Sequence, residues 1–152
     1  MLRPSKLADY ATVIMTSLAH DPERLRNAAD LAAETHLAVP TVSKVLKRLA
    51  REGLLVSIRG AHGGYRLARP PTEITMAQII AALEGPLGLT DCAAHNGRCG
   101  IESLCHVRGN WLRINLAVQR ALDGVTLAVM AEPFPPLHAG EMPLRRAHIQ
   151  GV

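Results

Sequence analysis

The chain has 152 residues, of which 48% are hydrophobic and only 3% aromatic, and its formal net charge is +4. This length predicts one domain, or a small domain with appendages, built on an aliphatic core. No apolar run is long enough to span a membrane and the first residues lack the apolar segment of a signal peptide, so we expect a cytoplasmic protein.

Two helices are predicted at the start of the chain. The first runs from about Ser5, a suitable N-cap, to Ala19, with apolar residues recurring at helical spacing. The pattern breaks at Pro22. Asn27 then caps a second helix, A-A-D-L-A-A-E-T, which is expected to stop near His36.

A third helix is predicted after a short turn over residues 37–39. Pro40 suits the first helical position, where its missing N–H is not needed, and Gly53 closes the helix. Four apolar residues form one stripe along it: Val42, Val45, Leu46 and Leu49. Polar and basic residues occupy the positions off that stripe: Thr41, Ser43, Lys44, Lys47, Arg48 and Arg51.

A β-hairpin is predicted next, from the runs L-L-V-S-I-R and Y-R-L-A on either side of G-A-H-G-G. Its tip presents Arg59 and His62 on a glycine-rich turn, which suits contact with phosphate or an adjacent minor groove. A histidine in such a loop is often only solvated. Gly63 and Gly64 are expected to leave room for the approach of a partner.

Two further helices are predicted in the second half of the chain. One is capped by Thr75 and ends at Gly85. The other covers residues 107–123 and carries an apolar stripe: Val107, Trp111, Ile114, Val118 and Leu122. This stripe packs either on the chain's own domain or on a second copy, and we favour a homodimer.

Three cysteines lie within one fourteen-residue segment, and the other 138 residues contain none: Cys92, Cys99 and Cys105. An odd number argues against a closed disulfide framework, and clustered thiolates suit iron–sulfur clusters, zinc or copper(I). The gaps of six and five residues are wider than the usual spacing of zinc ligands. A zinc-stabilised site and a metal-free thiol redox switch remain as alternatives.

These parts together predict a mainly α fold with a small β-hairpin wing, a winged helix-turn-helix followed by a long C-terminal helix. Residues 38–70 contain seven Lys and Arg against one acid, a local field that suits a polyanion, although a solvated basic helix would look the same. A major groove admits one helix whose outward side chains donate to bases and phosphates. Five residues of the third helix are therefore predicted to bind double-stranded DNA: Thr41, Ser43, Lys44, Lys47 and Arg48.

The chain is accordingly divided into four parts. Residues 1–86 are the expected winged helix-turn-helix domain, residues 87–106 the cysteine loop and residues 107–130 the dimerisation helix. Residues 131–152 are rich in proline and glycine with weak periodicity, which predicts a largely disordered tail.

The runs V-P-T-V-S-K-V-L-K-R-L-A-R-E-G-L-L and R-G-A-H-G-G-Y-R-L-A-R-P, with the three-cysteine loop, resemble the IscR/NsrR family of bacterial iron–sulfur regulators. The resemblance covers about residues 1–130. The runs S-K-L-A-D-Y-A-T and A-L-E-G-P-L-G-L-T-D-C look most like the branch that regulates SUF-type cluster assembly genes. The family resemblance implies a dimeric transcription factor, usually a repressor, with a [2Fe-2S] or [4Fe-4S] cluster on the loop before the dimerisation helix.

The same resemblance assigns three thiolate ligands to the cluster: Cys92, Cys99 and Cys105. The IscR pattern has a histidine three residues after the last cysteine, where this chain has Arg108. The NsrR pattern has an aspartate in a K-x-x-D motif of the first helix, which residues 6–9 match. Asp9, of the same or the partner subunit, is therefore the first choice for the fourth ligand, followed by His106 and His95. An acid at Asp9 also favours the helix macrodipole.

A cluster with three thiolates and one weaker ligand leaves an iron open to oxygen, nitric oxide or iron shortage, which predicts a sensor. A nitric-oxide-sensing repressor is a further alternative. The chain has no H-x-E, G-x-S-x-G, P-loop or paired-carboxylate arrangement in a suitable context. We therefore expect neither enzyme activity nor a small-molecule substrate.

Overall fold

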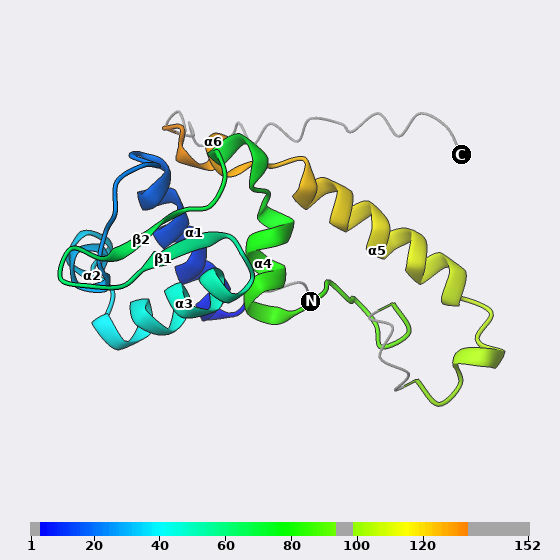
Figure 1. Cartoon of the computed structure of the whole chain (residues 1–152). Coiled ribbons are helices and arrows are strands. Elements are labelled where there is room, and N and C mark those ends of the chain that lie inside the picture. The colour runs from blue at the N-terminus through cyan, green and yellow to red at the C-terminus, as the bar shows by residue number, and fades with distance from the viewer. Residues whose placement is uncertain (1–3, 94–98, 134–152) are drawn as a thin grey trace, which may run out of the picture.

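The computed structural model describes residues 4–93 and 99–133, and Figure 1 shows a helical body from which one long helix extends. The first helix, α1 (Lys6–Ala19), is the centre of that body. Four other helices pack against it, namely α2 (Ala28–Thr35), α3 (Val39–Arg51), α4 (Met76–Glu84) and α6 (Leu127–Ala131). Within the described residues, no helix is long and apolar enough to cross a membrane. Residues 134–152, most of the predicted tail, lie outside this description.

The helix starts follow the caps expected from the sequence. The Ser5 hydroxyl accepts a hydrogen bond from the Ala8 N–H at 3.2 Å, and the Asn27 side chain accepts one from the Asp30 N–H at 2.9 Å. Each cap satisfies one of the N–H groups that a helix start leaves without a partner. The start of α3 differs, because Val39 rather than Pro40 is its first residue and its N-cap has no capping side chain.

The wing is a two-stranded antiparallel sheet of β1 (Leu55–Ile58) and β2 (Gly64–Leu67). Its register pairs Leu55 with Leu67, and both side chains are buried. The hairpin therefore packs on the helical body through its base and leaves its tip outside. The predicted mainly α fold with a small β-hairpin wing is confirmed. Two short 3-10 helices, η1 (Pro71–Glu73) and η2 (Glu102–Leu104), complete the described elements.

The predicted helix over residues 107–123 is confirmed as α5 (Arg108–Asp123), which extends away from the body (Figure 1). The chain then turns back. The Met76 N–H donates to the Val125 carbonyl at 2.9 Å, and the Leu127 N–H donates to the Ile74 carbonyl at 2.7 Å.

This return changes the expected division of the chain. The helix expected over residues 107–130 ends at Asp123, and the short α6 begins at Leu127. Leu127 is fully buried in the same core as α1 and α3. The packed body therefore includes residues that follow the cysteine loop, beyond the boundary expected at residue 86.

Candidate nucleic-acid interface and cysteine loop

The two sides of α3 differ sharply in burial. The apolar stripe is fully buried and fixes the helix to the body: Val42, Val45, Leu46 and Leu49. On the other side Lys44 and Lys47 are exposed, and Thr41, Ser43 and Arg48 are half-buried. The five predicted DNA-binding residues of this helix thus share one accessible side.

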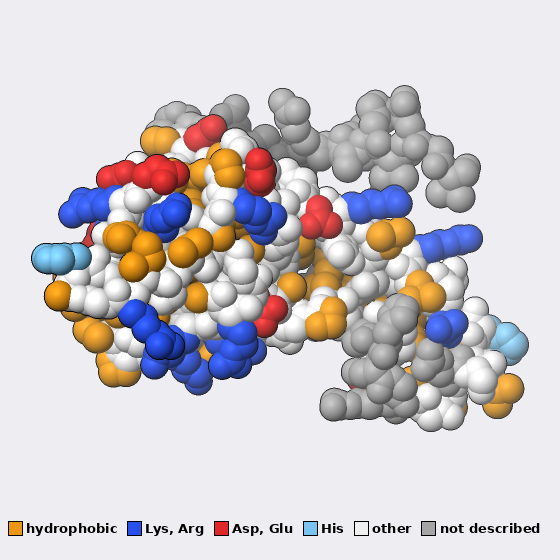
Figure 2. All heavy atoms as spheres, viewed as in Figure 1, with side chains coloured by type: hydrophobic (Ala, Val, Ile, Leu, Met, Phe, Trp, Pro, Cys, Tyr) orange, Lys and Arg blue, Asp and Glu red, His pale blue; other side chains and the backbone are white. Residues whose placement is uncertain are grey.

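Positive charge gathers on the side of the molecule that α3 occupies. In Figure 2 Lys and Arg side chains form a cluster along the lower edge of the body, where Figure 1 places α3. The helix itself contributes four basic side chains and no acidic one: Lys44, Lys47, Arg48 and Arg51. A basic surface of this kind attracts the phosphate backbone of nucleic acid.

The tip of the wing carries the two side chains expected there. Arg59 and His62 are both exposed. The turn between the strands contains Gly60 with φ of +119°, a backbone conformation that favours glycine. The tip thus projects a cation and an imidazole beyond the sheet, beside the helical body.

Gly63 and Gly64 lie where the protein's own backbone leaves no room for a side chain. A Cβ at Gly63 would lie 2.2 Å from the Ile58 carbonyl oxygen, and one at Gly64 would lie 2.8 Å from the Arg26 carbonyl oxygen. Gly64 is also buried. Both glycines are therefore required by packing within the protein, and their contact with DNA stays a prediction.

The cysteine loop contains three free thiols. Cys92 is only 5% exposed, and its sulfur lies 3.2 Å from the Thr90 hydroxyl oxygen in a hydrogen bond. Cys99 and Cys105 are partly exposed. In residues 4–93 and 99–133, no three His, Cys, Asp or Glu side chains converge closely enough to hold a metal ion.

The candidates for a fourth ligand are dispersed. Asp9 is exposed in the first turn of α1 and is not grouped with the three cysteines. His106 is exposed beside Cys105. His95 lies outside the described residues. A single chain in this conformation therefore supplies three separate thiols, and Asp9 does not join them.

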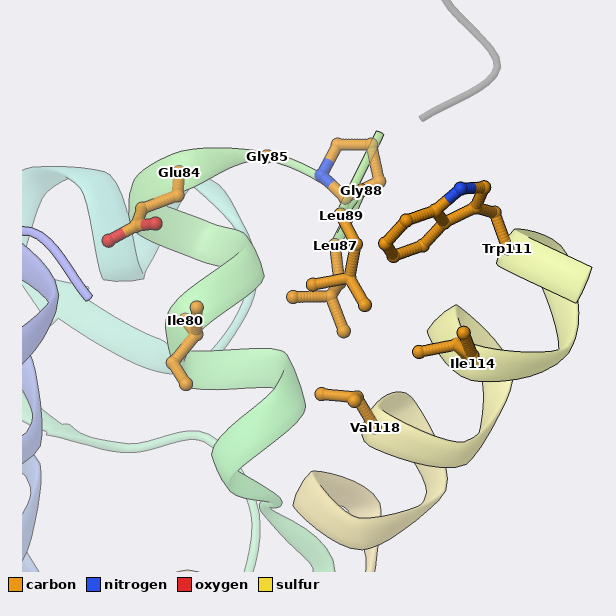
Figure 3. Close-up of a pocket in the computed structure, with 10 residues that line it drawn as sticks. Ile80, Glu84, Gly85, Leu87, Gly88, Leu89, Trp111, Ile114 and Val118 are labelled. Carbon is orange, nitrogen blue, oxygen red and sulfur yellow. The ribbon is translucent and has the colours of Figure 1, made fainter. Parts of the chain in front are cut away.

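An apolar groove separates α5 from α4. It has a volume of about 570 Å³ and is lined by apolar side chains of both helices and of the connecting loop, as Figure 3 shows: Ile80, Leu87, Leu89, Trp111, Ile114 and Val118. Trp111 is 39% exposed and Ile114 is 46% exposed. The apolar face of α5 is thus only partly covered by the described part of its own chain.

Asn115 is a polar residue on this helix that sequence analysis passed over. It is buried, and its side chain binds the backbone of the loop at Leu87 and Leu89. The signal was present, because Asn115 follows Trp111 by four residues and precedes Val118 by three, a spacing that places it beside the apolar stripe.

Comparison with known proteins gives the family. The model of the Rrf2 family, described as an iron-dependent transcriptional regulator, matches residues 5–133. The regulator NsrR of Geobacillus kaustophilus is 34% identical over 126 residues, which cover 82% of this chain and 86% of NsrR. The family match includes the winged body, the cysteine loop and α5.

Solved structures agree with the sequence relatives. The structure of CymR, the global cysteine regulator of B. subtilis, matches with a TM-score of 0.67 and 32% identity over 86% of this chain and 97% of CymR. IscR of T. potens matches with a TM-score of 0.64 and 29% identity, covering 85% of each chain. These relatives are transcriptional regulators and not enzymes, in agreement with the expectation from the sequence. From its fold and these similarities, the chain belongs to the Rrf2 family of winged-helix transcriptional regulators.

Proposed function

We propose that this Rrf2-family regulator binds operator DNA as a homodimer, and that an iron–sulfur cluster on its cysteine loop controls the binding. The observation that carries the proposal is the position of three free thiols on the loop between the winged body and α5. The family description as iron-dependent and the similarity to proteins named NsrR and IscR add support.

In this proposal α3 lies in a major groove. Its buried stripe holds the helix on the body while the accessible side donates to bases and phosphates: Thr41, Ser43, Lys44, Lys47 and Arg48. Arg59 and His62 at the wing tip contact the adjacent backbone or minor groove. The basic cluster of Figure 2, on the side of the body where α3 lies, supports this orientation of the helix toward DNA.

The partner is a second copy of the chain, joined through α5. The apolar face of α5 has Trp111 and Ile114 both more than one-third exposed, which is unusual for a surface that stays in water. Pairing two copies through this helix also positions two copies of α3 for the two half-sites of a palindromic operator.

The donor set fits a cluster in its chemistry. Three thiols are soft donors suited to iron, and the buried Cys92 also has a hydroxyl at 3.2 Å that can hydrogen-bond its sulfur. Asp9, exposed on α1, is available to a partner subunit and is proposed as the fourth ligand. When bound, the cluster supplies an iron that oxygen, nitric oxide or iron shortage can alter or remove. We infer that the regulated genes encode SUF-type cluster assembly and that the protein represses them.

Anaerobic purification tests the cofactor and its ligands together. The protein is expected to be brown, with a cluster visible in absorption and Mössbauer spectra, and Asp9→Ala is expected to alter the iron spectrum. Asp30→Ala is the matched control, since Asp30 is an exposed acid in the first turn of α2. Spectra that Asp9→Ala leaves unchanged remove Asp9 from the ligands, and a colourless protein with stoichiometric zinc contradicts the cluster.

A thiol redox switch is the second candidate. It is favoured by the partial exposure of Cys99 and Cys105 and by the absence of a converged metal site in the described residues. Exposed thiols can be oxidised to a reversible disulfide without metal. Mass spectrometry after mild peroxide treatment distinguishes it, because a disulfide in a metal-free protein that changes DNA affinity supports the switch over the cluster.

A further inference from the structure

Asn115 holds the start of the cysteine loop with both ends of its amide. Its Oδ1 accepts a hydrogen bond from the Leu89 N–H at 3.1 Å, and its Nδ2 donates to the Leu87 carbonyl at 3.1 Å. The residue is 9% exposed. A buried side-chain amide that binds two backbone groups fixes the segment more firmly than either hydrogen bond alone.

The segment that Asn115 binds continues directly to Cys92. Thr90 follows Leu89, and its hydroxyl oxygen lies 3.2 Å from the Cys92 sulfur. The Ala93 N–H donates to the Thr90 carbonyl at 3.0 Å and also lies 3.3 Å from the Thr90 hydroxyl. A continuous set of short contacts therefore leads from the Asn115 amide to the sulfur of Cys92.

Asn115 lies on α5, beside the apolar side chains of that helix. Ile114 is its neighbour in the chain and lines the groove of Figure 3 together with Trp111 and Val118. The fold contains no other described side chain that hydrogen-bonds residues 87–89 to α5. A displacement of the loop around Cys92 would therefore change the two hydrogen bonds that Asn115 makes from α5.

We propose that Asn115 is a positioning residue that couples the chemical state of Cys92 to the placement of α5, and through α5 to DNA binding by the dimer. This inference rests on the proposed function. It assigns the coupling to one polar residue. The apolar side chains of the groove make no directional contacts, whereas the hydrogen bonds of Asn115 change when the loop moves relative to α5. No residue of α5 belongs to the described core cluster, so replacing Asn115 is expected to leave the core of the winged body intact.

The experiment compares Asn115→Ala with Asn110→Ala, an exposed asparagine on the same helix. The first measurement is the alkylation rate of Cys92 relative to Cys105 in the metal-free protein, by mass spectrometry. Asn115→Ala is expected to raise this ratio on the order of tenfold, because two hydrogen bonds that keep the loop closed are lost. Asn110→Ala is expected to leave it unchanged.

The second measurement uses a duplex selected from random sequence by the wild-type protein. It is the ratio of the higher to the lower of the two DNA affinities, one measured with the cluster and one without it. Asn115→Ala is expected to reduce this ratio on the order of tenfold. Asn115→Gln, which keeps both the donor and the acceptor of the amide on a longer side chain, is expected to reduce it less. Loss of helical content alone would not change the ratio in this graded way.

The outcomes separate the inference from the proposed function. A wild-type ratio above one that Asn115→Ala leaves intact, or unchanged protection of Cys92, overturns the coupling alone. A wild-type ratio of one overturns the proposed function and the coupling with it. A rise in Cys92 alkylation together with a reduced affinity ratio, both absent in Asn110→Ala, supports the coupling.

Discussion

The backbones of Arg26 and Tyr65 exchange two hydrogen bonds, from the Arg26 N–H to the Tyr65 carbonyl at 3.0 Å and from the Tyr65 N–H to the Arg26 carbonyl at 2.9 Å. The Arg26 side chain is buried, donates to the carbonyl and hydroxyl of Ser17 at 3.2 Å each, and pairs with Glu34. One residue thus connects the wing to α1 and α2. The position of the wing relative to α3 is set inside the protein, before DNA is present.

Replacing Arg26 is expected to destabilise the fold. Arg26→Met keeps the bulk of the side chain but removes its hydrogen bonds to Ser17 and its pairing with Glu34, and the free energy of unfolding should fall by about 1–3 kcal/mol. Urea denaturation followed by circular dichroism measures it. Arg24→Met, at an exposed position, is the control, and equal losses in the two variants would contradict the role of Arg26.

A methyl group at position 64 is expected to disturb the wing. Because the Cβ of Gly64→Ala would lie 2.8 Å from the Arg26 carbonyl oxygen, the two backbones must separate, at a cost of about 1–3 kcal/mol. Thermal unfolding measures the loss. Gly109→Ala in α5 is the control, since nothing lies within 4 Å of its added Cβ, and it should be neutral or slightly stabilising. An unchanged melting temperature in Gly64→Ala would show that the close approach is absent.

Leu127 is expected to stabilise the winged body although it lies after the cysteine loop. It is fully buried, so Leu127→Ala should lower the free energy of unfolding by about 2–5 kcal/mol. Val129→Ala, at a side chain that is 53% exposed, should change it by no more than about 0.5 kcal/mol. Denaturant titration compares the two. Similar small effects would mean that α6 does not belong to the core.

The contribution of α3 to DNA binding can be measured through its salt dependence. Lys44→Ala and Lys47→Ala should each weaken binding and reduce the slope of log affinity against log salt by about 0.9 for each lost phosphate contact. Fluorescence anisotropy on a selected duplex at several salt concentrations gives the slopes. Arg120→Ala, an exposed cation on α5, should keep the wild-type slope. The same salt-dependence slope in all three variants would show that DNA does not contact Lys44 and Lys47 of α3.

In the proposed homodimer, the two copies meet through the apolar face of α5. Trp111→Asp introduces a charge on that face and is expected to convert the dimer to a monomer at micromolar concentration, because a buried unpaired carboxylate is costly. Size-exclusion chromatography with light scattering measures the mass. Val129→Asp, exposed on α6, should remain dimeric. A monomeric wild-type protein would contradict the assigned interface.

The elements that sequence analysis predicted correctly depend on neighbours in the chain. Ser5 and Asn27 cap their helices by bonding N–H groups three residues ahead, and the stripe of α3 repeats every three or four residues. The two apolar runs around the glycine-rich tip pair as the expected hairpin. Such interactions are short in sequence, so residue order alone contains the information for them.

The three relationships that only the tertiary structure decided join residues far apart in the chain. The first is the pairing of Arg26 with Tyr65, which explains why position 64 must be glycine. The second is the hydrogen bond of Leu127 to Ile74. The third is the pair of hydrogen bonds from Asn115 to Leu87 and Leu89. The sequence determined the winged helix-turn-helix, its basic helix and its thiol-rich loop. It could not determine these contacts, because a buried backbone or amide group finds its partner only when the packed chain brings distant segments within hydrogen-bonding distance.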